Sequence, residues 1–284
     1  MTIQKKSYRI KSPAKINIGL RILSKRKDGY HNLETIFFPI EVFDNLNVKI
    51  TPAKDEFKIT VKTVFKNKKI KQNLNNENNI CYKSAKLFLE RFKIKEFCKI
   101  HVDITKNIPT GAGLGGGSSN AASVLLVLAK HFLGKSEKTT AMMPAINKLA
   151  LDLGSDVPFF LLNKPAYATG RGEKLIPLPK FKINYDILLA LPGIKISTSW
   201  AFAQLKRQKI KGKKLNAIKS FKLSDKDKFV NDFEAPVFKK YPAISAIKRK
   251  MYNSGAVFAS MTGSGSAVYG FYKKILPLPK LLST

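Results

Sequence analysis

One stretch of the chain, residues 109–122, joins a glycine-rich turn to the polar start of an apolar helix. It reads Pro-Thr-Gly-Ala-Gly-Leu-Gly-Gly-Gly-Ser-Ser-Asn-Ala-Ala. Glycines let backbone N–H groups approach an anion without a Cβ in the way. The unpaired N–H groups of a helix's first turn, aided by the helix dipole, favour negative charge at the same place. The stretch therefore predicts a phosphate-binding loop and a phosphorylated ligand.

Residues 111–116 also satisfy the Gly-x-Gly-x-x-Gly pattern of dinucleotide-binding proteins. That motif needs a second parallel strand with an acidic residue about 20 positions further on. Here the next segments, 118–132 and 141–153, both have the apolar periodicity of helices, and Glu137 lies in the polar loop between them. We therefore exclude the dinucleotide-binding interpretation.

The Walker A pattern fails as well, because residues 134–136 read Gly-Lys-Ser but Ala129 stands where the first glycine is needed. The two motifs typical of protein kinases, HRD and DFG, are absent. What remains is a phosphate loop with no lysine of its own, followed by two serines whose hydroxyls are able to bind phosphate oxygens or a phosphate-bound magnesium ion. We expect the nucleotide contacts at Pro109, Gly111, Gly113, Leu114, Gly115, Gly116, Gly117, Ser118 and Ser119.

If a nucleotide phosphate binds at this loop, its transfer needs an acceptor site, charge neutralisation and a base for the acceptor hydroxyl, and two charged residues are candidates for these roles. Asp156 directly precedes the hydrophobic run 157–162, where a carboxylate is costly unless it is paired. Lys15 lies in a predicted strand whose alternation places it on one face with Asn17 and Gly19. Taken singly, a lysine on a strand is usually solvated, and an aspartate before a proline is often a helix cap.

The patterning predicts an α+β protein with two layers and a ligand cleft between them. We place an N-terminal domain with the phosphate loop at residues 1–165 and a C-terminal domain at 166–284; the resemblance described below implies that the first binds ATP and that the second lies on the substrate side. Expected strands and helices carry period-two and 3.6-residue patterns respectively. They are extended segments at 7–23 and 30–40, antiparallel strands at 46–50 and 57–64, a strand at 99–104, helices at 79–92, 118–132, 141–153 and 241–253, a strand at 185–191, and a hairpin at 256–272.

The formal net charge of +33 raises the alternative of a basic nucleic-acid-binding protein. Only seven of the 52 basic residues are arginine, the residue that base readout and phosphate clamps favour. The lysines are spread along the whole chain, often beside asparagines. We interpret them as a solvated surface that reflects an adenine-thymine-rich coding bias.

Cysteine, histidine and hydropathy patterns predict a soluble, cytoplasmic protein without a metal site built by its own side chains. Cys81 and Cys98 have no Cys-x-x-Cys spacing, and the three histidines are scattered. The first nine residues carry lysines with no apolar run behind them, and the longest apolar run, 121–129, is too short to cross a bilayer.

The loop, Lys15 and Asp156 together resemble the GHMP small-molecule kinases, the superfamily of galactokinase, homoserine kinase and mevalonate kinase. Residues 262–267, Thr-Gly-Ser-Gly-Ser-Ala, are similar to the superfamily's C-terminal glycine-rich motif, and the resemblance runs from about residue 7 to 272. It implies an N-terminal domain like domain two of ribosomal protein S5 and a ferredoxin-like C-terminal domain. Within the superfamily, residues 13–20, 28–35, 154–160 and 231–234 resemble the members that phosphorylate the 2-hydroxyl of 4-diphosphocytidyl-2-C-methyl-D-erythritol.

Carried over residue by residue, the resemblance implies that Asp156 is the base for that hydroxyl and that Lys15 orients and polarises the reacting pair. It implies that Tyr30 and Phe202 stack on the cytosine ring and that His31 reads its edge, which suits aromatic faces and an imidazole with one donor and one acceptor. Further substrate contacts are implied for Asn17, Thr198, Gly263, Ser264 and Gly265. ATP is the implied donor, with Mg²⁺ bound through the nucleotide phosphates, in a monomer or weak dimer with no membrane partner. A kinase for homoserine or mevalonate remains the nearest alternative.

Two segments depart from the family's pattern. Phe38-Pro39 stands where family members have a Phe-Gln pair, which predicts an altered following strand. The end of the chain, 273–284, contains Pro277 and Pro279 and does not read as the helix expected after the last strand.

Overall fold

The computed structural model describes residues 3–66, 74, 76–134, 137–205, 215 and 220–273. The side chains of residues 137–139 are outside that description. The chain divides into two compact units: the first comprises residues 1–14, 41–108 and 115–163, and the second comprises 15–40, 109–114 and 164–284.

The first unit contains a sheet built around β4 (Cys98–Lys106), with the second half of β2 (His31–Pro52) on one side and β3 (Lys58–Phe65) on the other. β2 and β4 are antiparallel, from the pair Asn45↔Thr105 to the pair Pro52↔Cys98. β3 and β4 are parallel over the whole length of β3. The expectation that the strand at 57–64 pairs antiparallel is therefore wrong, because an alternating pattern buries one face in either direction of pairing.

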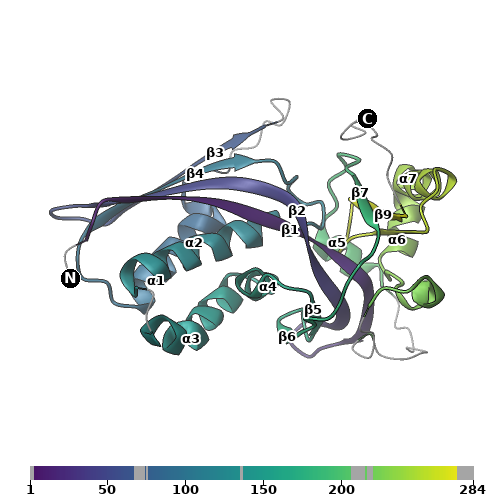
Figure 1. The fold of residues 1–284 in the computed structure, drawn as a ribbon, viewed down its shortest axis with the longest axis horizontal. Helices are drawn as coiled ribbons and strands as arrows, with labels where there is room; N and C mark the ends of the chain where they lie inside the picture. The colour runs from purple at the N-terminus through teal and green to yellow at the C-terminus, as the bar shows by residue number, and fades with distance from the viewer. Residues whose placement is uncertain are drawn as a thin grey trace. The chain divides into compact units, whose positions relative to one another are not determined.

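Among its described residues the first unit has four α-helices: α1 (Ile80–Arg91), α2 (Gly116–Phe132), α3 (Glu137–Leu153) and α4 (Val157–Leu162). In Figure 1, α1, α2 and α3 lie together on one side of the strands of this unit. α1 begins where the Asn79 side chain accepts a hydrogen bond from the Cys81 N–H, which satisfies one of the helix's first donors. α2 carries the longest apolar run of the chain and is buried over most of its length. The helices expected at 79–92, 118–132 and 141–153 are thus confirmed.

The second unit holds the end of β1 (Lys6–Lys25) from Lys15 onward and the first half of β2, which pairs antiparallel with β5 (Ala166–Thr169), as β5 does with β6 (Lys174–Pro177). A second sheet has the order β7-β9-β8 and is antiparallel throughout. Its strands are β7 (Asp186–Ala190), β8 (Phe258–Met261) and β9 (Val268–Tyr272). The helices of this unit are α5 (Thr198–Ala203), α6 (Glu234–Lys240) and α7 (Pro242–Asn253).

A hydrophobic core in the second unit gathers side chains from α5, α6, α7 and the β7-β9-β8 sheet, among them Ala201, Val237, Ile244 and Met261. The predicted strand at 185–191, helix at 241–253 and hairpin at 256–272 are confirmed. The departure at Phe38-Pro39 does not interrupt β2, which continues through both residues, and the Phe38 ring packs edge-on against Phe181. The expectation for the end of the chain falls on residues 274–284, outside the described part. No helix in the described residues is long and apolar enough to cross a membrane.

Candidate active site

The first half of the predicted phosphate loop, residues 109–114, belongs to the second unit and is tied to two other segments of it. The backbone N–H of Lys15 donates to the Leu114 carbonyl at 3.0 Å, and that of Ala267 donates to the Ala112 carbonyl at 3.2 Å. Gly113 has φ +78°, and a Cβ there would lie 2.1 Å from the carbonyl oxygen of Thr262. Both the positive φ and this close approach require glycine, so the loop packs backbone against backbone on residues 262–267.

Elsewhere in this half, Gly111 also has a positive φ, and its α-carbon is exposed beside the Lys195 side chain. Pro109 opens this part of the loop, directly after segment 41–108 of the first unit. The hydroxyl of Thr262 lies 3.4 Å from the carbonyl of Gly113, which adds a side-chain contact to the backbone packing.

The second half of the loop belongs to the first unit and opens α2. Gly115 precedes the helix in the left-handed conformation and, as a glycine, has no side chain with which to cap this end. Gly116 is buried, and a Cβ there would lie 2.8 Å from a methyl carbon of Ile108. At Gly117 the nearest atom to such a Cβ is 3.9 Å away. Gly117 is exposed, so the N-terminus of α2 has open space at this residue.

The two serines that follow, Ser118 and Ser119, differ in burial. Ser119 is fully buried, and its hydroxyl lies 2.7 Å from that of Ser12, which also accepts a hydrogen bond from Ser123 at 3.2 Å. Its backbone N–H donates to the Gly115 carbonyl, as in any helix. Ser118 is only half-buried. Ser119 therefore links α2 to β1, and its expected nucleotide contact stays a prediction.

A buried polar cluster contacts α2, and it was not predicted from the sequence. The carboxylate of Asp44 forms an ion pair with Lys106, accepts the N–H groups of Asn107 at 2.7 Å and Ile108 at 2.9 Å, and accepts from the Asn120 amide at 3.1 Å. Asp44 is wholly buried. Because it joins the end of β4 to the second turn of α2, it fixes the strand and helix between which the loop runs. An isolated Asp-Asn pair at the end of an apolar stretch gives no sequence signal for this role.

Asn120 has one further property. Its side-chain oxygen is buried and has no hydrogen-bond partner among the described residues. A buried carbonyl-type oxygen without a donor is rare in proteins, and it leaves an acceptor one helical turn from the open space at the start of α2.

Lys15 and Asn17 lie together on β1 in the second unit, as alternation predicts. The ammonium of Lys15 donates to the Asn17 side-chain oxygen at 2.6 Å and lies 5.0 Å from the centre of the Phe37 ring. The Asn17 amide donates to the Thr35 hydroxyl at 3.1 Å. Lys15 is only 3% exposed, so the interpretation of a solvated strand lysine is wrong.

Asp156 directly precedes α4 in the first unit. Its backbone is helical, and its side chain does not cap α4. The alternative of a simple helix-capping aspartate is therefore wrong. Its pairing with Lys15, which belongs to the other unit, stays a prediction.

The predicted cytosine-binding residues lie in the second unit. The His31 and Phe202 rings stack, with centres 5.0 Å apart and planes 22° apart. Burial, followed by the charge of Lys25, lowers the pKa of His31, so its imidazole is neutral at pH 7. Tyr30 is 53% exposed, and the guanidinium of Arg171 lies 4.5 Å above its ring. Arg171, in the turn between β5 and β6, was missed because a lone arginine between glycines reads only as a turn residue.

Thr198 and the C-terminal glycine motif come together as well. The hydroxyls of Thr198, at the start of α5, and Ser264 are 3.2 Å apart. Gly263 and Gly265 both have positive φ in the turn between β8 and β9. The structure thus joins two segments whose predicted roles concern the same substrate.

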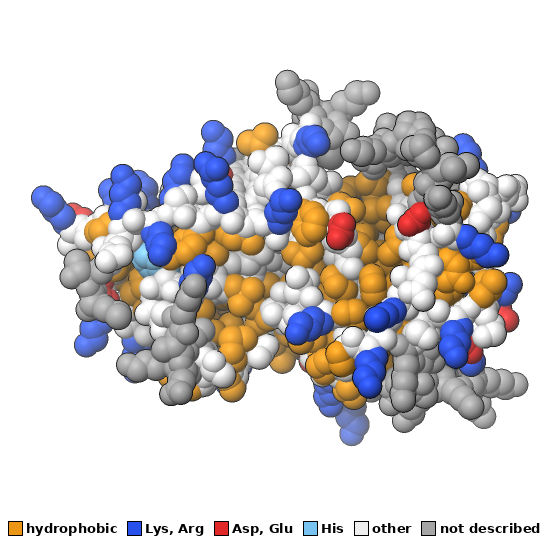
Figure 2. All heavy atoms as spheres, in the orientation of Figure 1, with side chains coloured by type: hydrophobic (Ala, Val, Ile, Leu, Met, Phe, Trp, Pro, Cys, Tyr) orange, Lys and Arg blue, Asp and Glu red, His pale blue; other side chains and the backbone are white. Residues whose placement is uncertain are grey.

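Basic side chains are widely distributed. Figure 2 shows lysine and arginine side chains scattered over many elements of the visible face rather than gathered in one patch. This agrees with the interpretation of a solvated, lysine-rich surface.

Two family models match the chain. Residues 79–164 match the GHMP kinases N terminal domain, and residues 213–275 match the GHMP kinases C terminal model. The first match contains the whole start of α2 and Asp156, and the second contains the glycine motif between β8 and β9. The arrangement is the α+β fold of the GHMP kinases, which are small-molecule kinases.

Individual relatives indicate a particular family within the GHMP kinases. The chain is 39% identical over 268 residues to a 4-diphosphocytidyl-2-C-methyl-D-erythritol kinase of Bacteroides thetaiotaomicron, covering 94% of this chain and 93% of that one. It is 40% identical to the kinase of the same name from Methylacidiphilum infernorum, covering 93% and 85% respectively. A crystal structure of 4-(cytidine 5′-diphospho)-2C-methyl-D-erythritol kinase matches with a TM-score of 0.70 and 31% identity over 93% of this chain and 90% of that one. The chain belongs to the 4-diphosphocytidyl-2-C-methyl-D-erythritol kinase family.

The fold alone is shared more widely. A homoserine kinase from Cytophaga hutchinsonii matches with a TM-score of 0.65 at 15% identity, over 96% of this chain and 87% of that one. Fold likeness at that identity does not carry the substrate from one protein to the other.

Proposed function

We propose that this protein transfers the γ-phosphate of ATP to the 2-hydroxyl of 4-diphosphocytidyl-2-C-methyl-D-erythritol, a step in the non-mevalonate route to isoprenoid precursors. The observation that carries the proposal is the 39% identity, over nearly the full length of both chains, to a kinase named for this substrate. The aromatic pair His31 and Phe202 supports the cytidine part of the proposal.

The nucleotide half of the proposed site is the start of α2. Open space beside Gly117, a glycine at the N-cap position and the half-buried Ser118 all fit a triphosphate there. When bound, ATP would supply the phosphoryl group, and Mg²⁺ held through its phosphates would neutralise part of their charge. The hydroxyls of Ser118 and Ser119 are both proposed to contact the phosphates, and the Ser119 hydroxyl also lies 2.7 Å from that of Ser12.

The acceptor half is centred on Lys15 and Asn17. The buried Lys15 ammonium brings a fixed positive charge to the acceptor, and Asn17 holds that ammonium through its side-chain oxygen. Asp156 takes the proton of the 2-hydroxyl while the hydroxyl oxygen bonds to the γ-phosphorus and the bond between that phosphorus and ADP breaks. Because the transition state of phosphoryl transfer is loose, positioning and charge contribute more than proton removal.

Cytidine recognition is proposed for the rings of Tyr30 and Phe202, with His31 at the base edge. A neutral imidazole offers one donor and one acceptor, which is what discrimination of cytosine requires. Thr198 and the glycine motif with Gly263, Ser264 and Gly265 are proposed to line the rest of the substrate site.

An ADP-release assay with three acceptors tests the proposal: the cytidylated alcohol, homoserine and mevalonate. We expect turnover only with the cytidylated alcohol, and inhibition of that turnover by cytidine diphosphate. Turnover of either other alcohol, or no effect of cytidine diphosphate, would contradict the proposal. Asp156→Asn is expected to lower kcat by about 10²-fold or more, in line with general acid–base contributions.

We also propose that the protein works in the cytoplasm as a monomer or weak dimer, without a membrane or nucleic-acid partner. Sedimentation velocity over a concentration series measures the first point. A salt series of duplex DNA binding measures the last, and binding that survives physiological salt would contradict it.

A further inference from the structure

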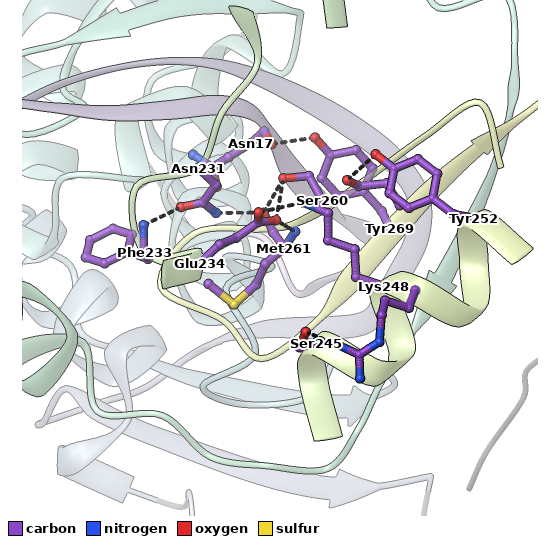
Figure 3. A network of polar contacts seen from close by, with 12 residues as sticks. Asn17, Asn231, Phe233, Glu234, Ser245, Lys248, Tyr252, Ser260, Met261 and Tyr269 are labelled. Carbon is purple, nitrogen blue, oxygen red and sulfur yellow. Dashed lines mark hydrogen bonds and ion pairs between the residues drawn. The ribbon is translucent and has the colours of Figure 1, made fainter. Parts of the chain in front are cut away.

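The segment 231–234, Asn-Asp-Phe-Glu, is part of the resemblance to the family but has no role in the proposed reaction. In the second unit it leads into α6 and lies against the end of β8 (Figure 3). Asn231 is 2% exposed, and both ends of its side chain are used. Its amide donates to the carbonyls of Met261 at 2.7 Å and Gly263 at 3.0 Å, and its oxygen accepts the N–H of Phe233 at 3.0 Å.

Glu234 holds the neighbouring residues from the same side. One oxygen of its carboxylate accepts the Met261 N–H at 2.8 Å and the Ser260 hydroxyl at 3.1 Å. Its other oxygen pairs with the Lys248 ammonium of α7 at 2.6 Å. Asn231 and Glu234 therefore fix the backbone on both sides of Thr262, through bonds to Met261 and Gly263.

Thr262 links the turn to β1. Its hydroxyl accepts the Asn17 N–H at 3.0 Å and donates to the Asn17 side-chain oxygen at 3.2 Å. That same oxygen accepts from the Lys15 ammonium at 2.6 Å. The Tyr269 hydroxyl adds a bond to the Asn17 carbonyl at 2.9 Å. Hydrogen bonds joined by the backbone of residues 261–263 thus connect Asn231 to Asn17 and Lys15.

We propose that Asn231, assisted by Glu234, is a positioning residue for phosphoryl transfer: it holds the turn at 262–265 so that Thr262 orients Asn17 and, through it, the Lys15 ammonium. This proposal rests on the proposed function, because that function gives Lys15 and Asn17 their place beside the acceptor hydroxyl. Buried backbone carbonyls must be paired, and the Asn231 amide is the donor that pairs those of Met261 and Gly263.

Asn231→Asp is the decisive variant, because it keeps the shape of the side chain and replaces its donor with an oxygen facing two carbonyl oxygens. We expect kcat to fall by about 100-fold, the effect of misplacing a reacting group by about 1 Å. KM for ATP should not change. When the new carboxyl is protonated it is able to donate to one carbonyl, so kcat of this variant should recover partly as the pH falls.

Asp232→Asn is the matched control, with the reverse exchange at the next position of the same segment. Asp232 accepts a hydrogen bond from the Ile22 N–H at 2.7 Å, and the side-chain oxygen of an asparagine at this position is able to accept the same bond. We expect its kinetic constants to equal those of the wild type. A second pair separates the hydrogen bond of Glu234 from its charge: Glu234→Gln keeps an acceptor for the Met261 N–H and should keep kcat, whereas Glu234→Ala should lower it.

Hydrogen–deuterium exchange supplies a readout that does not depend on turnover. Asn231→Asp should speed exchange in peptides covering residues 15–19 and 260–266, and Asp232→Asn should not. If the wild type does not phosphorylate the cytidylated alcohol, the proposed function fails, and the exchange pattern still decides the positioning role. Wild-type kcat in a folded Asn231→Asp protein, unchanged exchange at residues 15–19, or losses of kcat that simply follow thermal stability across all four variants would overturn the inference.

Discussion

Gly117 allows a test of whether a glycine is required by the fold or by a bound phosphate. Gly117 lies in the first turn of α2 without a positive φ, and a Cβ there would meet nothing closer than 3.9 Å. The protein's own packing therefore does not require glycine at this residue. If the open space is where phosphate approaches the helix, only the ligand requires it.

The variant Gly117→Ala should consequently be more stable and less active. Alanine is favoured over glycine in a helix by up to about 1 kcal/mol, which corresponds to a rise in melting temperature of about 2–4 °C for a chain of this size. A Cβ that prevents one charged hydrogen bond to phosphate costs about 1.5–3 kcal/mol of binding. The KM for ATP should therefore rise by at least about tenfold.

Differential scanning calorimetry and ADP release measure the two effects on one preparation. Gly134→Ala is the opposite control, because Gly134 follows α2 with φ +79° and lies outside the predicted nucleotide contacts. It should lower stability by about 1–2 kcal/mol with an unchanged KM for ATP. A Gly117→Ala protein that binds ATP as the wild type does would refute the placement of phosphate at this end of the helix.

Three further predictions concern buried groups. Asp44→Asn should lower the free energy of unfolding in urea by about 3–5 kcal/mol, because it leaves the buried Lys106 without its counter-charge; a loss below about 1 kcal/mol would contradict the assigned support. Burial lowers the pKa values of His31 and His131 below the ordinary 6.5, so the unfolded chain binds more protons and stability should decline as the pH falls below about 6.5. Unfolding midpoints at pH 7.5 and 5.5 test this, and His31→Gln should reduce the difference. Burial also raises the pKa of the Cys81 thiol to about 12 and that of the Cys98 thiol to about 11. Neither thiol should therefore react with a thiol reagent at pH 8 before the protein unfolds. Alkylation of either cysteine in the native protein would contradict this prediction.

Local features of this chain were predictable because their causes are local. The glycines around Gly113 and the apolar run after Ser118 predict a loop and a helix from the conformational freedom of one and the period of the other. The alternation around Lys15 placed it correctly beside Asn17 on β1. The direction of β3 was not predictable, because a strand's side chains alternate in the same way whether its neighbour is parallel or antiparallel.

Partnerships between distant residues depend on the whole fold and have no signal in one sequence. Asn17 and Thr262 are 245 positions apart and share two hydrogen bonds. Asp44 and Asn120 are 76 positions apart, and neither has a neighbour in sequence that indicates the other. Ser118 and Ser119 look alike as letters, but the 100° rotation between consecutive helical residues turns Ser119 toward Ser12 and leaves Ser118 half-buried.

The predicted phosphate loop illustrates why so short a motif needs support from so much of the chain. Its first half packs backbone on backbone against Thr262 in the second unit, and that contact fails with any side chain at Gly113. Its second half continues into α2, which Asp44 and Ser12 hold within the first unit. The two halves are therefore positioned by separate sets of buried polar contacts, one reaching Asn231 and the other reaching Lys106. Because phosphoryl transfer depends chiefly on placing donor and acceptor correctly, we expect substitutions of the residues that fix these halves to lower the rate of the proposed reaction, although none of them is expected to touch the transferred phosphate.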